Sequence, residues 1–161
     1  MKIQDIQKLY AMLPQAGAIQ KIQKDKSIRT VFLQGLVASA APMFFASIAE
    51  RWKTATVFVL NDNDEAGYFY NDLKTIAMPD GEGKVAEVLF FPSSYRRAVK
   101  YGQRDAGNEI LRTEVLTRLS ALATGADNAL PLYIVTEPSA LSELVVSKKQ
   151  LDERRLTLTM D

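Results

Sequence analysis

Residues 30–42 read TVFLQGLVASAAP. The first four are β-branched or large apolar residues, and they predict a short buried strand over residues 30–33. A glycine and several small residues follow, and then an apolar helix is predicted over residues 42–52, with Pro42 at its first position. A strand, a glycine-containing loop and a helix in this order form the frame of a phosphate-binding loop, G-x-x-x-x-G-K-[ST].

The residues that hold a phosphate in such a loop are missing from this frame. Gly35 supplies the first glycine, and Ala38 lies inside the loop. Ala40 replaces the second glycine, Ala41 replaces the lysine, and Pro42 replaces the hydroxyl that binds magnesium. Two interpretations follow: a degenerate phosphate-binding loop, or a strand-to-helix turn that never bound anything. Under both interpretations we expect these five residues to form no working nucleotide site.

Outward from this frame, apolar runs at residues 55–60, 85–91 and 132–135 predict three more strands. Helices are predicted between them, with a buried stripe between residues 66 and 77 and a longer helix over residues 108–122. The alternation predicts an α/β fold, with a parallel sheet and helices on both faces. We expect one domain over residues 1–161, with a helical segment over residues 1–28. Residues 156–161 begin an alternating strand, which we interpret as the start of a following, truncated module.

Two finer features of the helices are also predicted. Asn61, Asp62, Asn63 and Asp64 follow a strand and precede a helix, which favours helix capping over metal binding. In the helix over residues 108–122, the apolar face is predicted to contain Leu111, Val115, Leu119 and Leu122. Glu114 and Arg118 are spaced as an i,i+4 ion pair in the same helix.

The composition excludes several classes of chemistry. The 161 residues include no cysteine and no histidine, so disulfides, thiolate metal sites and Ser-His-Asp catalysis are excluded. The net charge is +1, which gives no overall attraction for nucleic acids or anionic membranes. The N-terminus lacks the apolar core of a signal peptide, and no apolar run has the length of a membrane span. We therefore expect a cytoplasmic protein with no membrane contact, no metal and no cofactor.

Residues 95–104 read YRRAVKYGQR and form the one strongly basic run. Cations next to tyrosines can contact a nucleic-acid backbone and stack on bases. The run lies between a predicted strand and a predicted helix, where binding residues are common. The alternatives are a solvated loop, or a loop paired with acidic residues elsewhere in a larger protein. The candidate DNA contacts are Arg96, Arg97, Lys100, Tyr101 and Arg104.

The ordered set of segments resembles the N-terminal part of bacterial transcription-repair coupling factor, which is itself similar to the first domain of the excision-repair subunit UvrB. The resemblance rests on residues 35–40, 56–60, 88–93, 110–119 and 132–141, and it continues into residues 156–158. The basic run at 95–104 departs from it, because the family has an aromatic, proline-containing stretch there. The resemblance implies a helicase-like domain with a degenerate phosphate-binding loop that has lost ATP binding.

The resemblance also implies a role for a larger parent protein. The parent would be an ATP-dependent translocase on double-stranded DNA that removes stalled RNA polymerase and recruits UvrA for nucleotide excision repair. Its motor domains and its UvrA-contacting module would lie outside these residues, so this domain would be non-catalytic and would contact other domains of the same chain. Two alternatives stay open: a nucleotide-binding enzyme derived from a phosphate-binding-loop fold, and a DNA-contacting module of another repair helicase.

Overall fold

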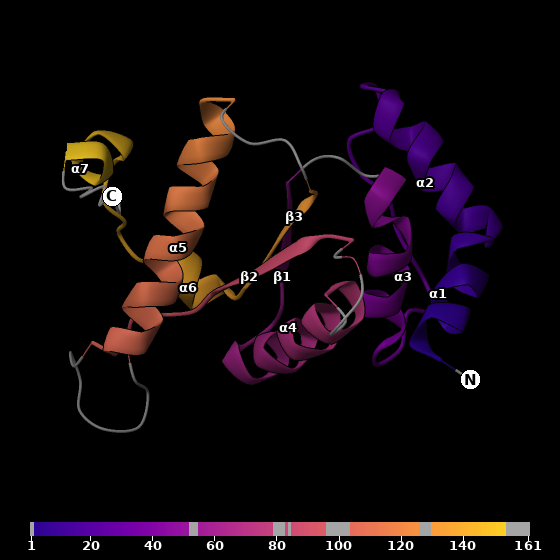
Figure 1. Ribbon diagram of the computed structural model, residues 1–161, viewed down its shortest axis with the longest axis horizontal. Coiled ribbons are helices and arrows are strands. Elements are labelled where there is room, and N and C mark those ends of the chain that lie inside the picture. Colours follow the sequence, from indigo (N-terminus) through magenta and orange to yellow (C-terminus); the bar gives the residue numbers. More distant parts are fainter. Residues whose placement is uncertain are drawn as a thin grey trace, which may run out of the picture.

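The computed structural model describes residues 2–51, 55–78, 83, 85–95, 104–125 and 130–153. These residues form a mixed α/β fold built on a small parallel sheet (Figure 1). The strands are β1 (Thr56–Val59), β2 (Glu87–Phe91) and β3 (Leu132–Thr136). The helices are α1 (Ile3–Ala11), α2 (Pro14–Lys24), α3 (Ala40–Ile48), α4 (Asn63–Ala77), α5 (Ala106–Ala123), α6 (Pro138–Ser142) and α7 (Lys148–Glu153), with a 3₁₀ turn at Ala49–Arg51.

Strand β3 is the centre of the sheet, whose order is β1-β3-β2. Both neighbours run parallel to β3, and both place their last residue, Val59 or Phe91, opposite Thr136. All five residues of β3 are buried, as expected for a strand covered on both faces. The three strands predicted around residues 55–60, 85–91 and 132–135 are therefore confirmed, and so is the parallel sheet.

The two faces of the sheet carry different helices. Helices α3 and α4 pack on one face, where Leu73, Val88, Tyr133 and Val135 belong to one buried cluster. Helix α5 packs on the other face, where Val115 meets a cluster that includes Leu89, Phe91 and Ile134. Figure 1 shows α4 and α5 in separate positions against the sheet, with α1, α2 and α3 grouped at the opposite side from α5. The prediction of helices on both faces is confirmed.

The strand predicted at residues 30–33 is wrong. Residues 28–37 have no regular secondary structure, and the Phe32 side chain is 86% exposed. Leu33 and Leu36 pack instead against a cluster formed by α2 and α3, which contains Ile19 and Phe44. Because this segment packs on helices and not beside a strand, β1 is the edge of the described sheet. The strand-loop-helix frame of a phosphate-binding loop is therefore not formed.

Helix boundaries differ from the predictions in smaller ways. Helix α3 begins at Ala40, so Pro42 is its third residue and not its first. On α5, the buried positions are Arg112 and Val115, while Leu119 is partly exposed. The helix is rotated so that the Arg112 guanidinium reaches main-chain carbonyls at the end of the sheet. Helix α7 was not predicted, and residues 156–161 lie outside the described residues.

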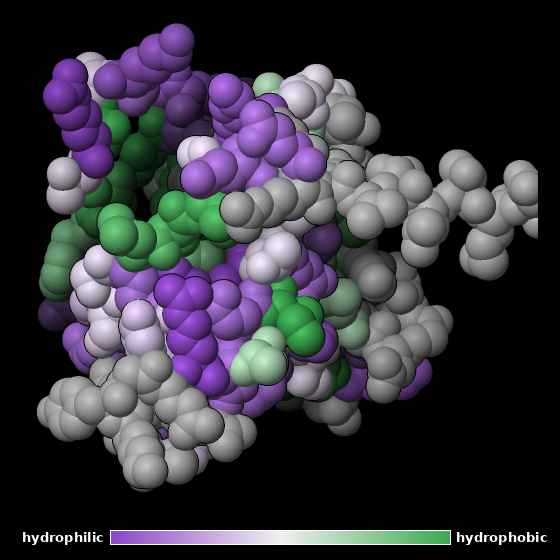
Figure 2. All heavy atoms as spheres, turned by 90° about the vertical axis from the view of Figure 1, so that its left-hand side faces the viewer, coloured by the Kyte–Doolittle hydropathy of each residue, from purple (hydrophilic) through white to green (hydrophobic). Residues whose placement is uncertain are grey.

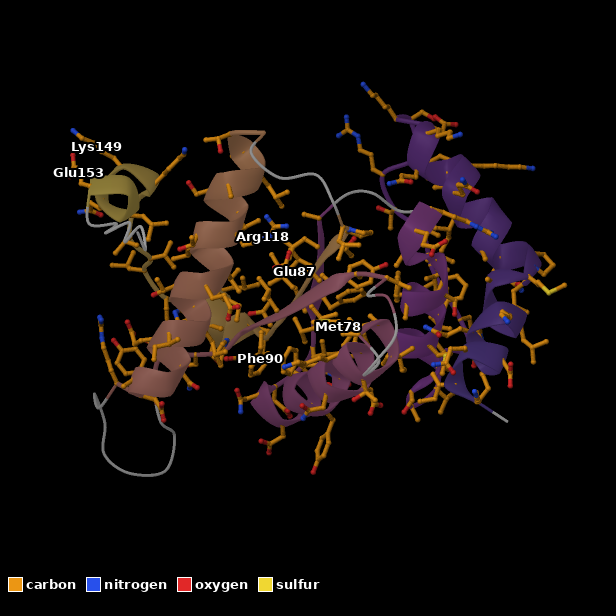
Figure 3. The ribbon with its side chains drawn as sticks, in the orientation of Figure 1. Met78, Glu87, Phe90, Arg118, Lys149 and Glu153 are labelled. Atoms are coloured by element: carbon orange, nitrogen blue, oxygen red, sulfur yellow. The ribbon has the colours of Figure 1, made fainter. Side chains whose placement is uncertain are left out.

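One predicted polar feature of the helices is confirmed, and the Glu114–Arg118 pair stays a prediction. Asp62 caps α4, because its carboxylate accepts a hydrogen bond from the Glu65 N–H at 2.9 Å. Arg118 on α5 forms an ion pair with Glu87 at the start of β2, with Nε and Oε2 2.5 Å apart (Figure 3). This pair joins α5 to β2, which is an edge strand of the described sheet.

Candidate functional site

The segment that resembles a phosphate-binding loop turns sharply before α3. Gly35 has φ +88° and Ala38 has φ +50°, both in the left-handed region. Glycine adopts this region freely, whereas alanine does so at a cost of order 1 kcal/mol. The tight turn is therefore present, and it connects an irregular segment outside the sheet to the first residue of α3.

Few main-chain donors at this turn remain for an anion. The Ala40 N–H donates to the Val37 carbonyl at 3.0 Å, and Pro42, which is buried, has no N–H. Among the first three residues of α3, at most the Ala41 N–H therefore remains as a donor to an anion. The Ser39 hydroxyl donates to the Asp72 carboxylate at 2.6 Å, so a negative charge lies beside the helix N-terminus. The charge and the lost donors both disfavour phosphate.

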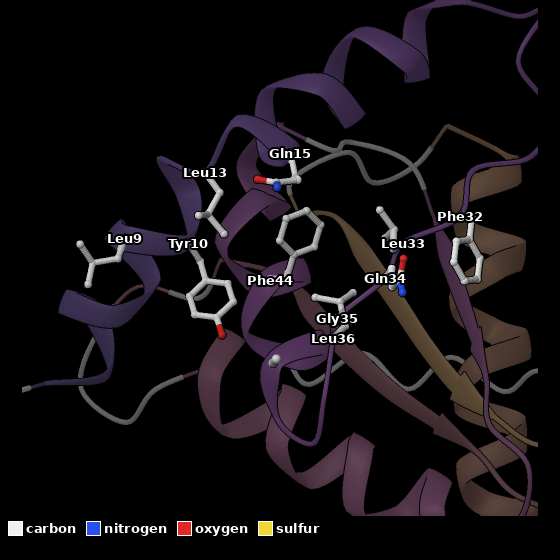
Figure 4. A pocket seen from close by; sticks show the side chains of 11 residues that line it. Leu9, Tyr10, Leu13, Gln15, Phe32, Leu33, Gln34, Gly35, Leu36 and Phe44 are labelled. Atoms are coloured by element: carbon white, nitrogen blue, oxygen red, sulfur yellow. The ribbon is translucent and has the colours of Figure 1, made fainter.

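A cavity of about 480 Å³ lies beside this turn, between α1, α3 and residues 32–36 (Figure 4). Its walls are mainly apolar, with Leu9, Leu13, Leu33, Leu36 and Phe44 among them. The described lining includes Gly35 and Ala40 but no charged side chain, while Ala38, Ala41 and Pro42 do not line it. A triphosphate needs cations or many N–H donors, so the cavity suits an apolar group better than a nucleotide.

The basic run enters the described structure only at its two ends. Tyr95 and Arg104 form an antiparallel bridge, and the Asp105 N–H donates to the Ser94 carbonyl at 2.8 Å. The Arg104 side chain is 66% exposed and lies 3.7 Å from the Glu109 carboxylate. The other four candidate DNA contacts, Arg96, Arg97, Lys100 and Tyr101, lie outside the described residues.

Next to this bridge is a polar cluster that the sequence did not reveal. One Glu143 carboxylate oxygen accepts a hydrogen bond from the Ser93 hydroxyl, and the other accepts one from the Ser94 hydroxyl, each at 2.5 Å. The Ser94 N–H donates to both oxygens, at 3.0 and 3.1 Å. Arg112 Nη1 lies 3.4 Å from Oε2 of the same carboxylate. Three hydrogen-bond donors and one cation therefore converge on one negative charge.

Arg112 is the buried member of this cluster, with 5% of its surface exposed. Its Nη1 donates to the Pro92 carbonyl at 2.8 Å and to the Ala140 carbonyl at 3.2 Å. The guanidinium also stacks over the Phe91 ring, 4.1 Å from the ring centroid. Arg112 thus joins the carboxyl end of β2, the helix α6 and Glu143.

The ionisation of Glu143 reflects two opposed effects. Burial by itself raises the pKa of this carboxyl, since it penalises the charged form. The hydrogen bonds from Ser93 and Ser94, together with the charge of Arg112, outweigh burial and lower the pKa below its ordinary value. Glu143 is therefore held as a carboxylate.

A second cavity, of about 410 Å³, opens onto this cluster. Its lining includes Ser94, Arg104, Arg112, Glu143 and Leu144, so it lies between the base of the basic run, α5 and residues 143–146. Ligands of parallel α/β sheets bind beyond the carboxyl ends of the strands, and β2 and β3 end here. Figure 2 shows that apolar and strongly polar side chains lie next to each other at this end of the molecule.

The described residues contain neither a membrane-spanning helix nor a cluster of metal ligands. None of the helices there is long and apolar enough to cross a membrane. No group of three or more acidic side chains in the described part of the chain is arranged to hold a metal ion.

Comparisons with protein-family models, with curated proteins and with solved structures found no match.

Proposed function

We propose that this chain is a non-catalytic α/β scaffold domain of the transcription-repair coupling factor type, and that it does not bind ATP. The observation that carries the proposal is the turn at residues 35–42. The turn keeps a left-handed glycine before an apolar helix, yet Pro42 and the Val37 carbonyl remove two N–H donors, and Asp72 adds a negative charge. A loop of this kind supports a structural role better than a catalytic one.

In the proposed role, the domain works inside a larger DNA translocase. ATP hydrolysis and movement along double-stranded DNA would belong to other domains of that protein, as would displacement of stalled RNA polymerase. The parallel sheet would give a rigid core to which those domains attach. The ordered segments that resemble the family support this placement, because three of them coincide with β1, β2 and β3 of the fold.

A binding experiment tests the placement within the family. Purified residues 1–161, immobilised and incubated with UvrA, should retain none, because the family's contact module would follow Asp161. A polypeptide of the same gene extended past Asp161 should retain UvrA. Stable retention by residues 1–161 alone, or none by the extended polypeptide, would contradict the proposed assignment.

A further inference from the structure

The donors around Glu143 form a ready-made site for an anion. We call Ser93, Ser94 and Arg112 the cradle, and residues 143–147 the strap. The cradle supplies two hydroxyl groups and one main-chain N–H, which all donate to the same carboxylate, and one guanidinium, which lies beside it as an ion pair. Arg112 itself is held in place by two carbonyls and the Phe91 ring. The cradle is therefore fixed by the fold, and Glu143 is its occupant.

The strap is attached to the domain mainly through that carboxylate. Leu144 is 100% exposed, and Val145 and Val146 are about half exposed, at 50% and 44%. Ser147 makes its hydrogen bonds to Gln150 and Leu151 of the adjacent helix α7. Leu144 buries none of its surface, and lifting the strap costs the hydrophobic free energy of two half-buried valines in addition to the loss of the Glu143 contacts.

We propose that the cradle is a carboxylate-binding site, which Glu143 fills in this structure and which an acidic side chain of a partner protein fills when the strap lifts. A single guanidinium with two hydroxyls matches one negative charge, and the donors address two oxygens in the arrangement of a carboxylate, which favours this ligand over a doubly charged phosphate. The cavity of about 410 Å³ gives the ligand a path to the cradle.

The strap and the basic run strengthen this assignment to an acidic partner. Lifting the strap uncovers the buried parts of Val145 and Val146 beside the cradle, where the Leu144 side chain is already fully exposed. Arg104 also lines the cavity and is largely exposed, and an acidic partner would compete with Glu109, 3.7 Å away, for this second cation. The same displacement would change the position of α7, so occupancy of the cradle by a partner would be transmitted along the chain beyond the strap.

The test uses Glu143→Ala in the 161-residue chain, with the Ser94 amide followed by ¹H–¹⁵N NMR. Sodium formate is titrated against sodium chloride at equal ionic strength. Formate should shift the Ser94 amide resonance saturably in Glu143→Ala. In the wild type, the apparent affinity for formate should be at least about ten-fold weaker. The tethered carboxylate competes there at an effective concentration in the millimolar range or above. The matched control is Glu153→Ala, which removes an exposed carboxylate of α7 that pairs with Lys149 at 3.9 Å (Figure 3); it should behave as the wild type.

Two further experiments test the carboxylate site and its proposed acidic partner separately. Adding Ser93→Ala and Ser94→Ala to Glu143→Ala should abolish the formate response. A peptide with the strap sequence SELVVS should bind Glu143→Ala at least about ten-fold more tightly than SQLVVS. Absence of a saturable shift, or equal shifts in Glu143→Ala and the wild type, would overturn the carboxylate site; equal binding of the two peptides would overturn the acidic partner. If Glu143→Ala does not fold, Glu143→Gln takes its place, because the amide keeps the side-chain volume and removes the charge.

Discussion

Replacing Arg112 by methionine should destabilise the domain strongly. Methionine keeps an apolar side chain over the Phe91 ring but removes the donors to the Pro92 and Ala140 carbonyls. It also leaves the Glu143 carboxylate without its cation, and the side chains of the pair are only 6% and 13% exposed. Removing one partner of a buried pair costs about 3–5 kcal/mol. For a chain of this size, that loss should lower Tm by roughly 6–20 °C.

The measurement is urea unfolding followed by circular dichroism, with Arg118→Met as the matched control. Arg118 lies on the same helix and also pairs with a carboxylate, but the side chains of that pair are 16% and 30% exposed. Water screens it better, so the control should lose only about 1 kcal/mol or less. If Arg112→Met loses no more stability than Arg118→Met, the buried cluster does not hold the end of the sheet, and the reasoning fails.

Three other predictions concern pH, a buried tyrosine and DNA. Because the pKa of Glu143 is lowered, its contribution to the free energy of unfolding is present above the ordinary pKa of 4.5 and is lost as pH falls through the lowered pKa. In Glu143→Gln, the free energy of unfolding should lack this loss at acidic pH. The same pH dependence in the variant and the wild type would contradict the prediction. Burial raises the pKa of Tyr133, whose hydroxyl donates to the Phe45 carbonyl at 2.8 Å. Tyr133→Phe should therefore lose about 1 kcal/mol near pH 7, with the wild-type advantage disappearing as pH rises above about 10, the ordinary tyrosine pKa. For any DNA binding, a plot of the logarithm of the binding constant against the logarithm of the salt concentration should have a slope no steeper than about −3.6. The binding should weaken when alanine replaces Arg96, Arg97, Lys100 and Arg104. DNA binding unchanged by that quadruple substitution would leave the basic run as a solvated surface.

The sheet could be predicted because its strands are short apolar runs bounded by proline or polar residues. Strand β3 reads LYIVT between Pro131 and Glu137, and all of its side chains are buried. Asp62 was predicted as a cap from its place before the helix α4, and its carboxylate does accept the Glu65 N–H. In both cases the information is local, so neighbours in the sequence decide the structure.

Residues 30–33 show where local information fails. Their side chains favour a strand, but a strand also needs a neighbour that supplies hydrogen bonds, and Leu33 finds its apolar contacts on α2 and α3 instead. The polar cluster was missed for a related reason. Ser93, Arg112 and Glu143 are far apart in the sequence, and only the convergence of β2, α5 and the strap brings their donors and acceptors together. Arg112, lying within a mainly apolar helix face, was the one signal available.

The most direct test of the central claim is a calorimetric titration of residues 1–161 with magnesium-ATP. The missing lysine and main-chain donor remove roughly 3–6 kcal/mol of binding free energy, at about 1.5–3 kcal/mol for each hydrogen bond to a charged group. A micromolar site would then become millimolar or weaker. Gly125→Val is the matched control for Gly35→Val, because Gly125 also has a positive φ, +71°, but lies at the end of α5. We expect no binding tighter than the millimolar range. A Kd below about 100 μM that Gly35→Val weakens and Gly125→Val does not would contradict the account and support a nucleotide-binding enzyme.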